Sequence, residues 1–259
     1  MPAQESDKIV YLEHPSGATA EVSIYGATVT SWTVDKVERL FVSKEAVRDG
    51  TKAIRGGIPL VFPIFGTKEK ISLPQHALKD TQLTQQQRSS WPHSFRLTYT
   101  VTLTAKSLKT VLVLKNEDED TFEFNTLLHT YFKVPDIANV SVEGLTSRTY
   151  HDKVQGGKHV ETNEKLTVAS EVDRVYCDVP DQLTVHTGNA TIGIKKINLK
   201  DIVIWNPWID KARSMGDFGD EEYPEMICVE AGSVADWVKL GGGQSWTGGQ
   251  ILTVLDARQ

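Results

Sequence analysis

Cysteine is scarce in this chain of 259 residues, which contains only Cys177 and Cys228. Two cysteines so far apart in the sequence make no disulfide framework, and they are typical of a reduced, cytoplasmic protein. Basic residues are also in deficit, because 28 lysines and arginines face 34 aspartates and glutamates. The net charge of −6 argues against nucleic acid, or an anionic membrane surface, as the main partner.

Long apolar runs and targeting signals are missing as well. No hydrophobic run approaches the ~18 residues that a membrane helix needs, and residues 1–8 are polar and acidic, unlike a secretory signal. The sequence contains no P-loop, Rossmann fingerprint, G-x-S-x-G elbow or H-E-x-x-H pair. We therefore expect no membrane association, no cofactor and no bound metal.

What the sequence does contain is the periodicity of β-strands. From Phe95 to Thr104 every odd position is apolar and every even position is polar, which predicts a half-buried strand. Strands are predicted at residues 9–13, 20–24, 28–34, 95–104, 110–116, 121–128, 140–143, 183–186, 191–197, 202–205, 226–230 and 251–255. The best helix candidate, Ser43–Arg48, has barely two turns. The predicted fold class is all-β, a large antiparallel β-sandwich with few short helices, in a single domain over residues 1–259.

Arg55 precedes two glycines and a strongly apolar segment that contains Pro59 and Pro63. Because proline cannot donate to a central ladder, the segment is predicted to be a sheet edge or an irregular apolar wall. The glycines would let the backbone approach another segment closely. Arg55 could offer its fork of donors to an anion or to sugar hydroxyls, or it could cap backbone carbonyls in a turn.

Two titratable residues stand in apolar surroundings near strand ends. His129 lies in an aromatic stretch, where an imidazole can act as a general acid or base, or can be a satisfied structural residue. Glu230 follows an apolar strand, where a carboxyl group with a raised pKa would be a better base than an exposed one. A glutamate at a strand end can equally be solvated.

Trp205 and Trp208 flank an Asn-Pro turn, and an acidic loop over residues 215–225 follows. Indole faces stack on the C–H bonds of sugars, and an asparagine side chain can bind hydroxyl groups. The same residues suit a corner of the hydrophobic core equally well, so both interpretations stay open at this point.

Taken together, five segments resemble the glucose-6-phosphate 1-epimerase family, which belongs to the aldose-1-epimerase (galactose mutarotase-like) superfamily. They are R-G-G-I-P-L-V-F-P-I-F-G (55–66), L-P-Q-H (73–76), L-H-T-Y-F (128–132), V-I-W-N-P-W (203–208) and I-C-V-E-A-G (227–232). The resemblance runs from the N-terminal I-V-Y-L-E-H-P-S-G segment to the last strand. It implies a large β-sandwich that interconverts the α and β anomers of hexose 6-phosphates, glucose 6-phosphate above all, without a cofactor.

The resemblance also implies roles for residues at matching positions. The general acid of the family falls on His129 and the general base on Glu230, and we expect the two to face one cleft across a gap wide enough for a pyranose ring. The substrate-binding positions fall on Arg55, Gln75 and Asp173. The implied partner is a small-molecule hexose 6-phosphate, and a monomer is expected.

One segment departs from the family pattern, which continues after L-P-Q-H with Gly-Phe-Ala-Arg. Here Asp80 stands where that phosphosugar-binding arginine is expected, and the chain resembles its relatives with an internal deletion around residues 77–91. Lys79 and Arg88 are candidates to replace the missing cation. Two hypotheses follow: a working hexose-6-phosphate mutarotase, or a catalytically weak or inactive sandwich that still binds the sugar phosphate.

Overall fold

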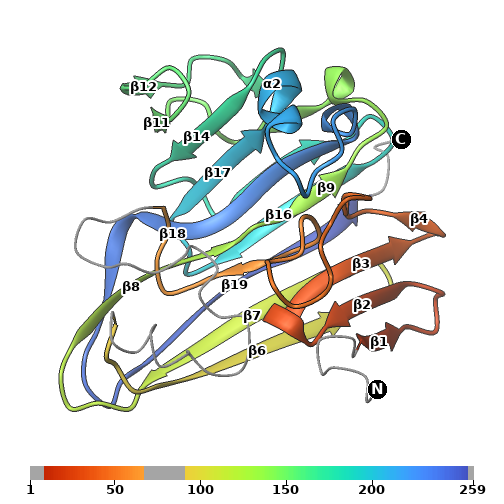
Figure 1. Ribbon diagram of the computed structural model, residues 1–259. Helices are drawn as coiled ribbons and strands as arrows, with labels where there is room; N and C mark the ends of the chain where they lie inside the picture. Colours follow the sequence, from red (N-terminus) through yellow and green to blue (C-terminus); the bar gives the residue numbers. More distant parts are fainter. Residues whose placement is uncertain (1–8, 67–90, 256–259) are drawn as a thin grey trace.

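The structure is a computed structural model that describes residues 9–66 and 91–255. In these residues the strands form three antiparallel sheets, and the all-β prediction is confirmed. Figure 1 shows the two large sheets stacked on each other, with the helix α2 beside β14 and β17. No helix in the described part of the chain combines the length and the apolar character of a membrane span.

Strands that are consecutive in sequence pair throughout the four-stranded sheet, whereas most neighbouring strands of the two large sheets are not consecutive. The four-stranded sheet contains β1 (Ile9–Glu13), β2 (Thr19–Ser23), β3 (Thr28–Val34) and β4 (Val37–Glu38). The seven-stranded sheet has the order β13 (Lys165–Leu166), β10 (Ser141–Glu143), β15 (Gln182–His186), β16 (Thr191–Ile197), β19 (Ser245–Leu255), β7 (Ser107–Asn116), β6 (Phe95–Leu103). The eight-stranded sheet has the order β12 (Lys158–Val160), β11 (Thr149–Asp152), β14 (Val172–Tyr176), β17 (Asp201–Asn206), β18 (Met226–Leu240), β8 (Phe122–Leu128), β5 (Leu60–Val61), and β9 (Tyr131–Lys133) pairs with β18.

Helical structure is sparse, as predicted, but it lies elsewhere in the chain. The α-helix of the described residues is α2 (Trp208–Arg213), and the 3-10 turns are η2 (Tyr25–Ala27), η3 (Ile137–Asn139) and η4 (Tyr223–Glu225). The helix candidate at Ser43–Arg48 is wrong, because that segment contains a turn at residues 44–45 and is otherwise irregular. The side chain of Glu222 binds the hydroxyl group of Ser43 and the backbone N–H of Lys44, and these contacts from outside the segment fix its backbone in an irregular path.

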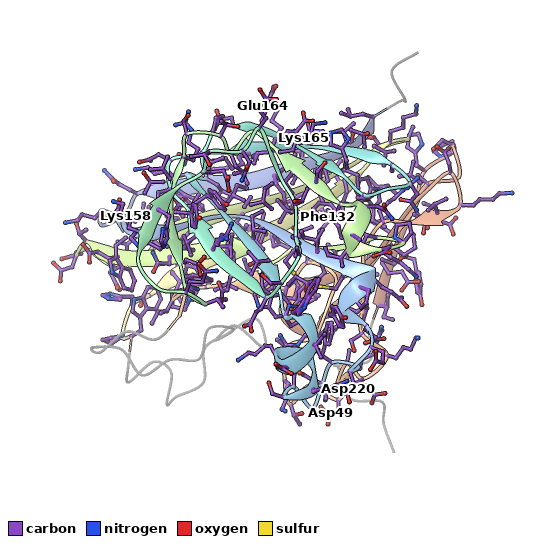
Figure 2. The ribbon with its side chains drawn as sticks, turned by 90° about the horizontal axis from the view of Figure 1, so that it is seen from above. Asp49, Phe132, Lys158, Glu164, Lys165 and Asp220 are labelled. Carbon is purple, nitrogen blue, oxygen red and sulfur yellow. The ribbon has the colours of Figure 1, made fainter. Side chains whose placement is uncertain are left out.

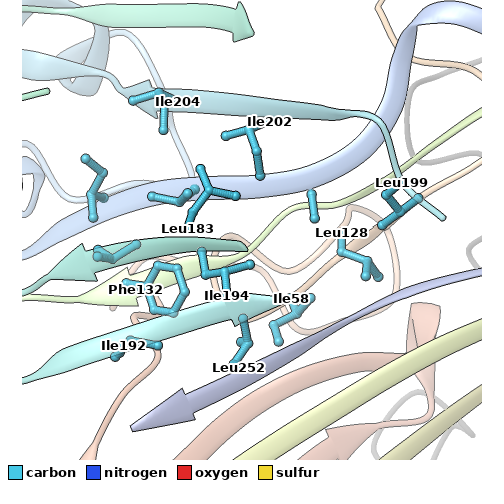
Figure 3. Close-up of a cluster of buried hydrophobic side chains, with 14 of the residues drawn as sticks. Ile58, Leu128, Phe132, Leu183, Ile192, Ile194, Leu199, Ile202, Ile204 and Leu252 are labelled. Atoms are coloured by element: carbon cyan, nitrogen blue, oxygen red, sulfur yellow. The ribbon is translucent and has the colours of Figure 1, made fainter. Parts of the chain in front are cut away.

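The two large sheets bury a shared hydrophobic core between them. Figure 3 shows part of it, where Ile202 and Ile204 of β17 approach Leu183, Ile194 and Leu252 of the seven-stranded sheet. Burial of such side chains contributes about 1.5–3 kcal/mol each. Viewed from above in Figure 2, the core side chains lie inside the sandwich and charged side chains project from its rim.

The other face of the eight-stranded sheet carries a separate apolar cluster, to which Val203 and Val175 belong. Because side chains alternate along a strand, residues next to the core residues of β14, β17 and β18 point away from the sandwich. Cα pairing places Val203 opposite Glu230, and Trp205 opposite both Cys228 and Asp173. Residues far apart in sequence thus converge on one outer face of the sheet.

The glycines after Arg55 are required by a close approach of backbones, as expected. Gly57 has φ +70°, and a Cβ atom at this position would lie 2.1 Å from the carbonyl oxygen of Val29. Gly56 has φ +130°, and its Cβ atom would lie 2.4 Å from the carbonyl oxygen of Phe41. The proline-containing segment that follows supplies only the two-residue β5 at the end of the eight-stranded sheet, which confirms the edge interpretation.

Candidate active site

The outer face of the eight-stranded sheet holds a cavity of about 400 Å³, which lies within the usual range for small-molecule sites. Its lining residues are Arg55, Phe65, His129, Lys153, Asp173, Val203, Trp205, Lys211, Met215 and Glu230. Four of the residues predicted from the sequence therefore meet in one cavity. The other predicted positions, Gln75, Lys79 and Arg88, lie outside the described residues.

Glu230 is the most deeply buried of the titratable groups in the cavity wall, with 1% of its surface exposed. Among the described residues, its Oε2 atom accepts no hydrogen bond. Burial raises the pKa of this carboxyl group well above its ordinary value, and the neighbouring Asp173 raises it further. A buried carboxylate with a raised pKa is a stronger base than an exposed one.

His129 follows β8 directly, and the pairing of Leu128 with Ala231 brings its side chain beside Glu230. Its Nδ1 atom lies 3.5 Å from Oε2 of Glu230, so the two groups are in contact and the pyranose-sized gap expected between them is absent. The imidazole ring stacks on Tyr131 at 4.6 Å between ring centroids, and Trp205 packs edge-on against it. These contacts hold the imidazole plane in a fixed orientation above the cavity.

Arg55 is held by a partner that the sequence did not indicate. Its Nη2 atom donates to both carboxylate oxygens of Asp217 at 3.1 Å, and its Nε atom donates to one of them at 3.3 Å. Its Nη1 atom donates to the hydroxyl group of Tyr131 at 3.4 Å. Arg55 therefore reaches the cavity with its charge compensated and its guanidinium plane fixed, rather than capping a turn.

Asp217 lies in the acidic loop that follows α2, and this loop is fastened to the segment before Arg55. The carboxylate of Glu222 accepts hydrogen bonds from the backbone N–H groups of Lys44 and Gly219 and from the hydroxyl group of Ser43. The Phe218 ring packs in a buried cluster with Phe41 and Tyr131. These contacts hold the loop in place, and the loop in turn holds the carboxylate of Asp217 against Arg55.

Asp173 projects from β14 and is 3.6 Å from the Nζ atom of Lys153. The ammonium group of Lys153 also lies over the ring of Phe65, 4.1 Å from its centroid. Burial raises the pKa of Asp173, Lys153 opposes this shift, and Asp152 adds to it. A half-buried carboxylate at this place can accept hydrogen bonds from sugar hydroxyl groups.

At the Asn-Pro turn Trp205 belongs to the cavity, whereas Asn206 and Trp208 are structural, and Trp208 packs against the hydrophobic core and the ring of Tyr223. Asn206 is fully buried, and its side-chain amide donates to the carbonyl oxygens of Tyr223 and Met226 while its Oδ1 accepts from the N–H of Trp208. The side chain of Asn206 therefore binds backbone groups, and of the residues at this turn Trp205 alone stays a candidate for a sugar platform.

Among residues 9–66 and 91–255, the group that could hold a metal ion is His129, Cys228 and Glu230, whose donor atoms all lie within 4.8 Å of one another. Burial raises the pKa of the Cys228 thiol, and Glu230 raises it further; the pKa of Glu230 is raised as well. Metal ions bind the deprotonated forms of both groups. The arrangement therefore suits proton transfer better than metal binding.

Comparison with known proteins identifies the family. The model of the family described as Aldose 1-epimerase matches residues 8–253. The chain belongs to the aldose 1-epimerase family. Its fold agrees with this assignment, because the crystal structure from Salmonella typhimurium described as "a putative mutarotase (YeaD)" superposes with a TM-score of 0.86 at 28% identity, covering 96% of this chain and 90% of that one.

Sequence relatives carry a more specific name. A protein of Cenchrus ciliaris named "Putative glucose-6-phosphate 1-epimerase" is 34% identical, over 95% of this chain and 84% of its own. A protein of Salmonella typhimurium with the same name is 32% identical, over 86% of this chain and 82% of its own. The first alignment spans 279 positions whereas this chain has 259 residues, so that relative has at least 20 residues without a counterpart here.

Proposed function

We propose that this epimerase is a hexose-6-phosphate mutarotase, which interconverts the α and β anomers of glucose 6-phosphate. The observation that carries the proposal is the contact between the buried carboxyl group of Glu230 and the imidazole of His129 in one cavity. In a pyranose hemiacetal both oxygens that exchange protons are bonded to C1. An acid and a base that act on them must therefore be neighbours, as these two groups are.

The proposed reaction opens the ring. The carboxylate of Glu230 removes the proton of the C1 hydroxyl group while protonated His129 donates a proton to the ring oxygen; the C1–ring oxygen bond breaks and the C1 carbonyl forms. After rotation about C1–C2, the hydroxyl group at C5 attacks the other face of the carbonyl. The proton of that hydroxyl group returns to His129, and Glu230 returns its proton to the oxygen on C1.

The remaining cavity residues supply binding and orientation in this proposal. Arg55, held by Asp217, offers donors to sugar oxygens, and Asp173 accepts from sugar hydroxyl groups. Trp205 offers an indole face to the sugar ring. No step calls for a cofactor.

The proposal is tested by following fresh α-glucose 6-phosphate with an excess of a dehydrogenase that consumes only the β anomer. The wild-type protein is expected to accelerate anomerisation above the buffer rate, and His129→Ala is expected to remove about 10²–10⁴-fold of that acceleration. A wild-type rate equal to the buffer rate, from protein shown to be folded, would support the inactive sandwich instead.

The pH dependence of the reaction provides a second check. Glu230 must be ionised to act as the base, and its pKa is raised above 4.5, the ordinary value of a glutamate. We expect kcat/KM to decline as the pH falls, with a midpoint above 4.5, and Asp173→Asn to move this midpoint downward because it removes a like charge. A midpoint at the ordinary glutamate value would contradict the assignment of Glu230 as the base.

A further inference from the structure

The cavity wall carries three cationic side chains, and their charges are not equally available to a substrate. Arg55 is compensated by Asp217, with two contacts of 3.1 Å. Lys153 is 3.6 Å from Asp173. Lys211 lines the same cavity, and no described residue forms an ion pair with it within 4.0 Å. Within the described part of this chain of net charge −6, Lys211 is therefore a cation at the cavity without an ion-pair partner.

Lys211 lies on α2, and the turn before this helix is fixed by buried contacts. The Oδ1 atom of Asn206 accepts a hydrogen bond from Trp208 N–H at 2.9 Å, and the Asn206 amide is anchored to the carbonyl oxygens of Tyr223 and Met226. The fully buried Asn206 thus determines where the first turn of α2 begins. Lys211 is presented to the cavity from a rigid element rather than from a free loop.

Lys153 and Lys211 line the same cavity, and both act on the carboxyl group of Asp173. The ammonium group of each lowers the pKa of that carboxyl group, which lines the cavity as well. The 3.6 Å separation between Lys153 and Asp173 exceeds the roughly 2.7–2.9 Å of a tight charge-assisted hydrogen bond. Lys153 can therefore turn toward an incoming anion, while Phe65 keeps its ammonium group at the cavity.

We propose that Lys211, assisted by Lys153, binds the phosphate group of the sugar substrate and determines the preference for phosphorylated over free hexoses. This inference rests on the proposed mutarotase function and names the residues that select its substrate class. Arg55 is less suited to this task, because Asp217 occupies two of its donor atoms and neutralises its charge. Arg55 is left to bind neutral sugar oxygens.

The test compares Lys211→Gln with the wild-type protein on α-glucose 6-phosphate and on free α-glucose. Loss of a hydrogen bond to a charged group predicts a decrease of about 10- to 100-fold in kcat/KM for the phosphorylated sugar, with the value for free glucose unchanged. Lys211→Arg should restore most of the loss because it retains the charge. Lys239→Gln is the matched control, because it removes one positive charge from an exposed ion pair with Glu123 outside the cavity lining.

Binding measurements separate this inference from the proposed function. Calorimetry of glucose 6-phosphate with each variant requires no turnover, so it reports on Lys211 even if the wild-type protein does not accelerate anomerisation. Selective weakening of glucose 6-phosphate binding by Lys211→Gln would support the assignment. Unchanged binding, equal losses for both sugars, or an equal effect of Lys239→Gln would each overturn it.

Discussion

Replacing Glu230 by glutamine is expected to return the anomerisation of α-glucose 6-phosphate to the rate of the buffer alone. Glutamine keeps the volume of the buried side chain but cannot accept the proton of the C1 hydroxyl group. Because Glu230 is 1% exposed and its pKa is raised by burial, the neutral replacement removes no charge that the fold requires. An effect of about 10²–10⁴-fold on catalysis is expected with little change in stability.

The measurement is the coupled dehydrogenase assay together with thermal unfolding of the same preparation. Glu143→Gln is a suitable control, because this partly exposed glutamate pairs with Lys165 and His186 on the seven-stranded sheet, away from the cavity lining. It should leave turnover unchanged. Near-normal turnover in Glu230→Gln would rule out Glu230 as the base and, with it, the proposed mechanism.

The largest expected effect on stability comes from Gly57→Ala. The added Cβ atom would lie 2.1 Å from the carbonyl oxygen of Val29, and φ at this position is +70°, where side chains are strained. Gly57 also donates to the carbonyl oxygen of Phe41 and accepts from the N–H of Tyr131, so its backbone cannot shift without breaking these bonds. A loss of about 3 kcal/mol or more in the free energy of unfolding is expected.

Urea denaturation measures this loss, and Gly243→Ala separates its two causes. Gly243 has a similar φ of +67°, but no atom lies within 4 Å of a Cβ built there. Its substitution should cost only about 1–2 kcal/mol from the backbone conformation. Equal losses in the two variants would show that the contact with Val29 is relieved by local movement.

The strand pattern was predicted well where one face of a strand is buried. The bounds of β1, β3 and β16 agree with the prediction, and in β16 the buried positions Ile192, Ile194 and Lys196 alternate with less buried ones. Strand β14 was not predicted, because in V-D-R-V-Y charged residues occupy both faces, with Asp173 in the cavity and Arg174 paired with Asp152. Alternation of polarity cannot reveal a strand whose two faces both carry charges.

Two strands near the C-terminus are longer than predicted. In β19 (Ser245–Leu255) the glycines at 248 and 249 masked the strand, since glycine is depleted in strands, but a Cβ at Gly249 would lie 2.3 Å from Thr110 O. In β18 a register shift between Ser233 and Val238 interrupts the alternation. Close approaches and bulges are set by the neighbouring strand, which the local sequence does not specify.

Some residues of the candidate site were also predicted from the sequence, and others were not. His129, Glu230, Arg55 and Asp173 were predicted from resemblance, and the cavity contains all four. Asp217 was missed because its role depends on Arg55, which lies 162 positions earlier in the chain. When folding brings two distant residues together, their contact leaves no local pattern in the sequence from which it could be predicted. The single domain over residues 1–259 and the monomeric state stay predictions.

The alternation along β18 has a consequence for how such a protein can diversify. Ile227, Val229 and Ala231 belong to the sandwich core, whereas Cys228 and Glu230 point to the opposite face. Alternate positions of one strand thus serve two purposes: one set packs the core, and the other set faces the cavity side of the sheet. Substitutions at the cavity-side positions, in evolution or in a directed-evolution library, can therefore change the substrate while the core positions keep the fold stable.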